Sequence, residues 1–175
     1  HLCTAAENGK EVLVIIELRA RFDEQNNIDW SERLEQAGCN IIYGLDDYKI
    51  HSKVCLITKN VNGEMKYITQ IGTGNYNEKT AKLYTDFSFI TENHEIGEDA
   101  VNFFNNISIS NLDGEYKHLW VAPNAMKDRI ISYIDNEMKK GKNGQIFIKV
   151  NSVTDKEIIC KLQEASKAGV DITML

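Results

Sequence analysis

A histidine and a lysine stand two positions apart in the segment YKIHSKVCLIT, residues 48–58. Side chains two apart in a strand point to the same side, so a strand over residues 50–58 would place His51 and Lys53 side by side. A neutral imidazole is a competent nucleophile towards phosphorus, and an adjacent ammonium stabilises charge on a phosphoryl oxygen. The pair is either an accident at the rim of a buried strand or part of a site for anions.

Further along the chain, a glycine-rich loop and an acid complete a set that fits phosphate chemistry. Backbone N–H groups of GTGN, residues 72–75, can cradle phosphate oxygens together with the Thr73 hydroxyl and the Asn75 amide. A carboxylate such as Asp86 can hold one imidazole nitrogen protonated, so that the other is free to attack. A lone histidine is more often structural and a lone GTGN is usually a turn, but their combination in this order favours phosphoryl transfer.

The composition limits the partners of the chain. Its 175 residues are 42% hydrophobic and 26% charged, as in soluble globular proteins. The formal net charge of −6 argues against a broadly basic surface for nucleic acid. No apolar run approaches the ~18 residues of a membrane span and no signal peptide is visible, so we expect a cytoplasmic protein. The four cysteines form no CxxC pair, which favours reduced, buried thiols over disulfides or zinc ligands.

Strand and helix patterns alternate along the chain and predict an α/β fold with a mixed sheet flanked by helices. The expected strands cover residues 10–18, 39–44, 50–58, 65–72, 83–91, 145–151 and 170–175. The expected helices cover residues 1–9, 28–38, 95–107, 124–144 and 154–169. Asn62-Gly63, between the third and fourth strands, is a strong signal for a β-hairpin.

The last elements repeat the order of the first ones. AAENGKEVLVIIELR and MKKGKNGQIFIKVN both indicate a helix end, a break with glycine and an apolar strand. SERLEQAGCNIIY and KLQEASKAGVDITML both indicate a helix, a glycine stop and a strand. Any βαβ unit has this outline, but matching order over ~30 residues favours a structural duplication. We expect a first domain over residues 1–107 and a junction with the opening of a second over 108–175.

The candidate site resembles the signature of the phospholipase D superfamily, in which HxK is followed by an aspartate and then by G-[ST]-x-N. The matching residues are His51, Lys53, Gly72, Thr73 and Asn75. Asp86 stands where that superfamily carries the acid that orients its histidine. Two departures, Thr58 at the usual aspartate position and the longer hairpin tip KNVNGE, count against an ordinary phosphodiesterase or nuclease, which stays an alternative.

A more specific resemblance covers essentially the whole chain. The stretches ARFDEQNNIDW, IHSK and GTGNYNEKTAKLYTD resemble bacterial polyphosphate kinase, the large histidine-phosphorylating family. The resemblance implies two phospholipase-D-like domains in tandem and reversible transfer of the terminal phosphate of ATP to polyphosphate through a phosphohistidine. It also implies Mg²⁺ as cofactor, ATP or ADP and inorganic polyphosphate as partners, and a homo-oligomer that can associate peripherally with the inner membrane.

The same resemblance implies roles for particular residues. His51 matches the histidine that takes phosphate from ATP, and Tyr84 matches a tyrosine that contacts the nucleotide. Arg21 matches an arginine associated with the magnesium site. Because a guanidinium has no lone pair for a metal, we expect Arg21 to bind phosphate oxygens beside Mg²⁺ rather than the ion itself. The other assignments rest on chemistry and the superfamily pattern, and concern Lys53, Thr73, Asn75 and Asp86.

Both ends of the sequence lie inside expected elements. His1 begins in a helix pattern, and the chain stops at Leu175 within an apolar strand. We therefore expect a piece of a longer protein, with a first domain truncated at its N-terminus and a second truncated at its C-terminus. A site built from both domains should leave these residues alone inactive, in which case they act as a degenerate phosphate-binding or oligomerisation module.

Overall fold

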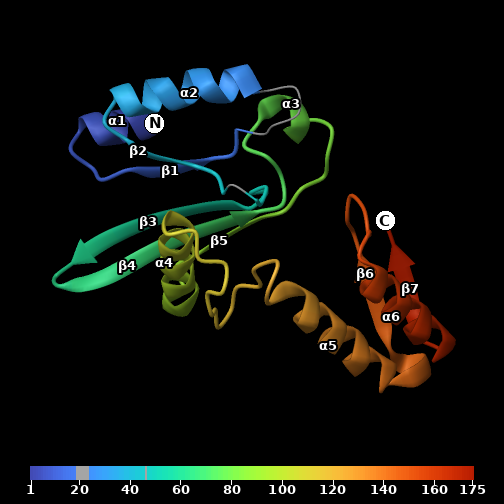
Figure 1. Ribbon diagram of the computed structural model, residues 1–175. Helices are drawn as coiled ribbons and strands as arrows, with labels where there is room; N and C mark the ends of the chain where they lie inside the picture. Colours follow the sequence, from blue (N-terminus) through green and yellow to red (C-terminus); the bar gives the residue numbers. More distant parts are fainter. Residues whose placement is uncertain (19–23, 46) are drawn as a thin grey trace. The chain divides into compact units, whose positions relative to one another are not determined.

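The computed structural model describes residues 1–18, 24–45 and 47–175, and these divide into two compact units, His1–Asn111 and Leu112–Leu175 (Figure 1). Each unit has its own helices, strands and sheet pairing. The α/β class predicted from the sequence is confirmed. The predicted domain boundary after residue 107 stays a prediction, because packing alone does not define a catalytic domain.

The first unit opens with a helix–strand–helix–strand arrangement. Its elements are α1 (Leu2–Glu7), β1 (Leu13–Ile16), α2 (Glu24–Gln36) and β2 (Asn40–Tyr43). The strands pair in parallel, from Leu13 opposite Asn40 to Ile16 opposite Tyr43. Gly38, at φ +91°, ends α2 in the left-handed conformation that glycine adopts without strain. Because β1 and β2 are parallel, their carboxyl ends, Ile16 and Tyr43, lie side by side at the same edge of this sheet.

An antiparallel sheet follows, in the order β3 (Lys53–Val61), β4 (Glu64–Gly72) and β5 (Ser88–Thr91). The hairpin turn between β3 and β4 is made by Asn62 at φ 55° and Gly63 at φ 87°, as the Asn-Gly pair predicts. A short helix, α3 (Glu78–Ala81), lies between β4 and β5, and the Asn77 side chain caps its N-terminus. The parallel and antiparallel strands form separate sheets.

The strand that carries the histidine–lysine pair begins later than the sequence predicts. β3 starts at Lys53, so the prediction of a strand from residue 50 is wrong and His51 lies in the connection before it. The Ile50 N–H donates to a carboxylate oxygen of Glu17 at 2.8 Å, and the His51 carbonyl accepts from the Lys53 ammonium at 2.8 Å. Backbone groups that bind side chains are not available to a β ladder.

The last strand of the first unit is also shorter than predicted. β5 covers only Ser88–Thr91. The N–H groups of Leu83 and Tyr84 donate to the Thr80 carbonyl at the end of α3, and Phe87 bonds to Thr73. The thiols differ from expectation as well. All four cysteines are free, but only Cys39 is buried, so the predicted burial is wrong for the exposed Cys55 and Cys160.

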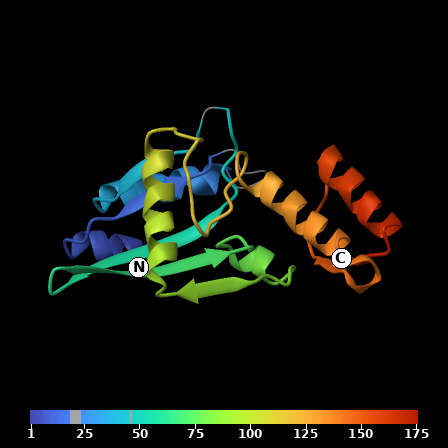
Figure 2. The same ribbon diagram turned by 90° about the horizontal axis from the view of Figure 1, so that it is seen from below.

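Helix α4 (His94–Ser108) packs on the β3–β4 hairpin (Figure 2). Its buried residues are Gly97, Asp99, Ala100, Phe103 and Ile107. Gly97 meets the side chain of Tyr67 so closely that a Cβ there would overlap the tyrosine. The Asn93 side chain caps the helix by accepting from Ile96 N–H at 3.1 Å. The absence of a side chain at Gly97 therefore allows α4 to pack closely against Tyr67 of β4.

The second unit repeats the element order of the first. It consists of α5 (Met126–Met138), a 3₁₀ turn η1 (Gly141–Asn143), β6 (Gln145–Ile148), α6 (Lys156–Lys167) and β7 (Asp171–Met174). The two strands pair in parallel, as β1 and β2 do. Its core consists of Ile134, Leu162, Ala165 and Val170. The common order and pairing agree with the internal repeat inferred from the sequence.

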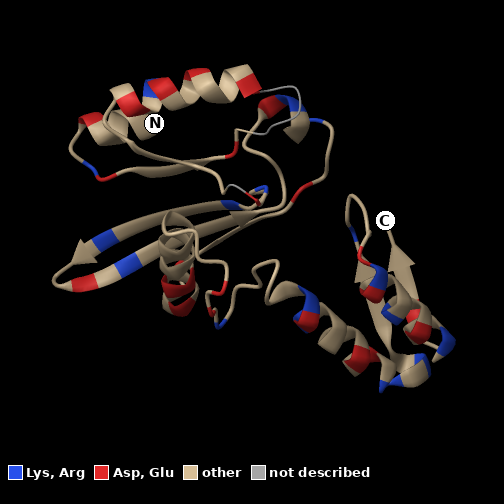
Figure 3. Cartoon of the chain, in the orientation of Figure 1, with Lys and Arg blue, Asp and Glu red and all other residues tan. Residues whose placement is uncertain are grey.

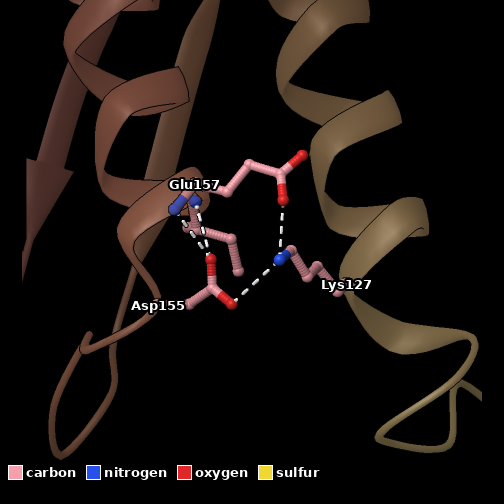
Figure 4. Close-up of polar contacts among 4 residues, drawn as sticks. Lys127, Asp155 and Glu157 are labelled. Carbon is pink, nitrogen blue, oxygen red and sulfur yellow. Dashed lines mark hydrogen bonds and ion pairs between the residues drawn. The ribbon is translucent and has the colours of Figure 1, made fainter.

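One lysine joins the two helices of the second unit (Figure 4). The Lys127 ammonium, from α5, lies 3.2 Å from Asp155 Oδ2 and 2.6 Å from Glu157 Oε2 at the start of α6. The other carboxylate oxygen of Asp155 accepts from the N–H groups of Glu157 and Ile158, and the bond from Ile158 is the main cause that lowers the pKa of Asp155. One carboxylate thus caps α6 and ties it to α5.

Across the described ranges, no helix is both long enough and apolar enough to cross a bilayer.

Gly97→Ala tests the packing of α4 on the hairpin. The added methyl group overlaps Tyr67, so helix and sheet must move apart, and we expect the free energy of unfolding to fall by about 1–3 kcal/mol. Urea denaturation followed by circular dichroism measures the change. Asn102→Ala, at an exposed position of the same helix, is the control and should leave stability nearly unaltered. Equal stability of Gly97→Ala and the control would contradict this packing.

Candidate active site

A buried lysine and the histidine before it form the centre of the site. Lys53 is only 8% exposed, and its ammonium lies 2.7 Å from His51 Nδ1 and 3.4 Å from Nε2. The ammonium also donates to the His51 carbonyl at 2.8 Å. An ammonium has donors and no acceptor, so the imidazole nitrogen that faces it offers a lone pair. The side chains that the sequence predicts side by side are therefore in contact, although they do not share a strand.

The pKa of the exposed His51 side chain is lowered, which favours the neutral imidazole. Partial desolvation by the surrounding protein is the largest cause that lowers the pKa of His51, and the charges of Lys53 and then Lys49 lower the pKa further. Burial is also the main cause that lowers the pKa of Lys53, while Asp86 opposes that shift and Lys49 adds to it. A neutral imidazole beside a desolvated ammonium is a nucleophile beside an anion-binding group.

The glycine-rich loop is fastened to the chain before β5 through Thr73. Its hydroxyl donates to Asp86 Oδ1 at 2.9 Å and accepts from Phe87 N–H at 2.9 Å. The backbone N–H of Thr73 donates to the Phe87 carbonyl at 3.0 Å. The hydroxyl predicted to bind phosphate thus holds Asp86 in place in this structure.

Gly74 is required by the closeness of Asp86. A Cβ at Gly74 would overlap the Asp86 carboxylate, with the Asp86 Cβ only 2.9 Å away. This glycine does not adopt a left-handed conformation, so the need for it is one of space alone. The sequence GTGN therefore lets an acid approach the loop, in addition to leaving its backbone accessible.

The structure places Asp86 near the cation of the site and does not join it to the imidazole. In the described part of the chain, the Asp86 carboxylate accepts from Thr73, and its charge raises the pKa of Lys53. The His51 ring contacts Lys53 instead. The orientation of His51 by Asp86 stays a prediction.

Three further predicted residues lie around this centre or outside the described ranges. Asn75 is exposed, and its carbonyl accepts from Asn77 N–H at 2.7 Å. Tyr84 is 56% exposed just after α3, with its backbone N–H bound to the Thr80 carbonyl. Arg21 lies outside the residues that the structure describes. The phosphate and nucleotide contacts of all three stay predictions.

Two features of the site were missed from the sequence. The Tyr76 hydroxyl donates to Gln70 Oε1, and the Gln70 amide donates to Ser88 Oγ at 3.0 Å, which links the loop to β4 and β5. Gln70, between Thr69 and Ile71 just before the glycine-rich loop, is the signal that could have indicated this chain of polar groups. The second is Glu17, directly after β1, whose carboxylate binds the backbone before His51.

Several of the acidic residues of the first unit lie away from the start of β3, on helix α4. Helix α4 carries three acidic residues and no lysine or arginine, and Figure 3 shows this concentration of negative charge. A chain with net negative charge can thus keep a small cationic site at the start of β3.

Lys53→Met tests the electrostatic account of the histidine. Methionine keeps an apolar side chain of similar length but removes the charge that disfavours the imidazolium, so the pKa of His51 should rise towards its ordinary value. Titration of the His51 ring protons by NMR measures this. Lys66→Met, at the far end of the hairpin and paired with Glu64, is the control and should leave the His51 titration unchanged. A fall or no change in Lys53→Met would contradict the account.

Family models and proteins of known name match this chain along nearly its whole length. Family models described as polyphosphate kinase C-terminal domain 1 and polyphosphate kinase C-terminal domain 2 match residues 1–112 and 119–175. Proteins named polyphosphate kinase are similar over nearly the whole chain. Those of Staphylococcus saprophyticus and Staphylococcus epidermidis are 51% and 52% identical over 99% and 98% of this chain. That of Halalkalibacterium halodurans is 48% identical over 99%.

A solved structure shows the same fold. The crystal structure of polyphosphate kinase from Porphyromonas gingivalis superposes with a TM-score of 0.84 and 38% identity, over 99% of this chain and 29% of that one. The chain spans about a quarter of the length of the relatives it matches. The family expected from the sequence motifs is confirmed: two domain models and relatives near half identity show that this chain belongs to the polyphosphate kinase family.

Proposed function

We propose that this chain carries the phosphate-accepting histidine of an ATP:polyphosphate phosphotransferase. The observation that supports it best is the buried ammonium of Lys53 against the neutral ring of His51. Among the described residues, this ammonium contacts the ring and the carbonyl of His51, both uncharged, and the charge of Asp86 only partly offsets its desolvation. Desolvated cations are stabilised by anions, and a phosphoryl group supplies one.

The reaction divides into two displacements at phosphorus. The lone pair of an imidazole nitrogen of His51 attacks the γ-phosphorus of ATP, the bond to the bridging oxygen breaks, and ADP leaves with its electron pair. A terminal oxygen of polyphosphate then attacks the phosphorus of the phosphohistidine, the N–P bond breaks, and the imidazole is restored. Splitting one transfer into two steps lets a single site handle both ATP and polyphosphate.

Lys53 has two roles in this scheme. In the structure its ammonium occupies an imidazole lone pair. A bound phosphoryl group offers a stronger, anionic partner, so the ammonium moves its hydrogen bond to a phosphoryl oxygen and releases the ring nitrogen. The same charge then stabilises the equatorial oxygens in the transition state. Substrate binding and activation of the nucleophile are thereby coupled.

The surrounding residues hold the substrate and the acid. Thr73 and Gly74 keep Asp86 beside the site, from which its carboxylate balances the Lys53 charge and orients the imidazole as Lys53 moves. Asn75 and backbone N–H groups of the loop bind phosphate oxygens, and Tyr84 contacts the nucleotide. Arg21 binds phosphate oxygens beside Mg²⁺.

Mg²⁺ enters the proposal as the counter-ion of the nucleotide. Within the described ranges, no group of three or more His, Cys, Asp or Glu side chains is placed to hold a metal ion. These residues therefore do not fit a protein-held magnesium site of their own, and no step above is assigned to the ion.

The remaining proposals rest on family membership and on the sequence itself, including its net charge of −6. They are a cytoplasmic homo-oligomer with peripheral association at the inner membrane, no role in nucleic-acid binding, and an inactive state of the 175 residues alone. A phospholipase-D-like phosphodiesterase or nuclease is not favoured, because the relatives are named polyphosphate kinase. Thr58 at the usual aspartate position of that superfamily agrees with this.

His51→Ala tests the proposal in the full-length protein. With γ-labelled ATP and Mg²⁺, the wild type should acquire acid-labile phosphate and make polymer, and the variant should do neither, because its nucleophile is missing. His94→Ala removes a histidine at the N-terminus of α4, outside the site, and should retain both activities. Acid-labile phosphate and polymer in His51→Ala would refute the proposal.

Gly74→Ala tests the role of the glycine-rich loop. The methyl group occupies the space of the Asp86 carboxylate and displaces it, so the rate of phosphohistidine formation should fall by about 10-fold or more. Rapid-quench measurement with labelled ATP gives this rate. Glu78→Ala, at an exposed position in α3, serves as the matched control. A wild-type rate in well-folded Gly74→Ala would show that the position of Asp86 does not matter.

A further inference from the structure

Glu17 is joined to two other segments of the first unit. It is half-buried and follows β1 directly. Its carboxylate Oε2 accepts from Ile50 N–H at 2.8 Å, and its backbone carbonyl accepts from the Asn27 amide of α2 at 2.9 Å. The residue thus links the end of β1, the second helix and the connection that carries His51.

The carboxylate of Glu17 lies where the two parallel strands end. A Cβ placed on Gly44, just after β2, would be 3.8 Å from Glu17 Oε2 and 3.9 Å from Oε1. Gly44 has φ +50°, so the chain turns there without a side chain. The Glu17 carboxylate therefore lies beside Gly44, at the edge where β1 and β2 end, and contacts the backbone of Ile50 in the connection to β3.

His51 is held from both sides by side chains. The amide of the preceding residue, Ile50, is bound by Glu17, and the His51 carbonyl is bound by the Lys53 ammonium. Residues 49–52 belong to no helix or strand, so neither a helix nor a β ladder fixes this backbone. The direction of the imidazole depends on the backbone from which it projects, and these two hydrogen bonds restrain that backbone.

Resting on the proposed function, we propose that Glu17 is a positioning residue that sets the direction of His51 for attack on phosphorus. It does so through the reach of its acceptor oxygen to Ile50 N–H, at 2.8 Å, and not through its charge. A displacement of about 1 Å in a reacting group can cost ~100-fold in rate, so one hydrogen bond at this point has a large effect.

Two conservative substitutions separate reach from charge. Glu17→Gln keeps the length of the side chain and an acceptor oxygen but loses the charge. Glu17→Asp keeps the charge but is one methylene shorter and does not reach Ile50 N–H. In the full-length protein, we expect Gln to form phosphohistidine within about 3-fold of the wild-type rate and Asp to be about 10–100-fold slower, with the KM for ATP little altered in both.

A purely structural role would give a different pattern. It would lower the amount of folded protein without changing the rate per folded molecule, so rates are normalised to the folded fraction from circular dichroism. Glu32→Asp, at an exposed position of α2, is the matched control. Wild-type rates in both Glu17 variants, a slow Gln with a fast Asp, or equal slowing of both would each overturn the proposal.

A second measurement reads the same contact without any reaction. NMR of the His51 ring resonances and hydrogen exchange of the Ile50 amide should match wild type in Glu17→Gln and change in Glu17→Asp. Unchanged resonances and exchange in Asp would overturn the positioning role. If the wild type forms no phosphohistidine, the proposed function fails, and these measurements still decide whether Glu17 positions His51.

Discussion

The ammonium of Lys53 is buried where β3 begins, and the arrangement of the site follows from how the chain accommodates this charge. A cation removed from water must find hydrogen-bond acceptors or lose its proton. Here it takes the carbonyl and a ring nitrogen of His51, which draws that residue out of the strand. Partial desolvation and the Lys53 charge both lower the pKa of His51, which favours the neutral imidazole. One lysine thus shapes the backbone, the protonation state and the affinity for anions.

Two further segments of the chain support this centre. In the first, Glu17 binds the backbone before His51 and connects it to the edge of the parallel strands. In the second, Thr73 binds both Asp86 and Phe87 and connects the glycine-rich loop to the start of β5. Each connection satisfies backbone groups at the ends of strands, where the ladder no longer does. The polar groups that stabilise the fold at this edge are therefore the groups that arrange the site.

Much of the fold could be predicted from local patterns. The Asn62-Gly63 turn requires positive φ at both residues, and the chain adopts it. Gly38 ends α2, and the periodic apolar positions of α4 face the hairpin. These features depend on residues close in sequence, so a single sequence contains the information.

The start of β3 could not be predicted in the same way. Residues 50–58 alternate like a strand, but the first part is diverted by contacts of Ile50 with Glu17, distant in sequence, and of His51 with Lys53. Glu17 itself was missed, because the apolar pattern placed it inside the expected strand over residues 10–18, whereas β1 ends at Ile16. The overlap of a Gly74 side chain with Asp86 also depends on tertiary approach. The sequence could predict which residue types form the site, but not which hydrogen-bond partners they have in the fold.

The central claim is that His51, activated beside Lys53, carries the transferred phosphate. The most direct measurement is to locate the phosphate by mass spectrometry and ³¹P NMR after brief reaction of the full-length protein with ATP and Mg²⁺. The account predicts a single phosphoramidate on the imidazole of His51, lost on addition of ADP or polyphosphate. Phosphate on another residue, or a phosphoramidate on His51 that neither acceptor removes, would contradict it.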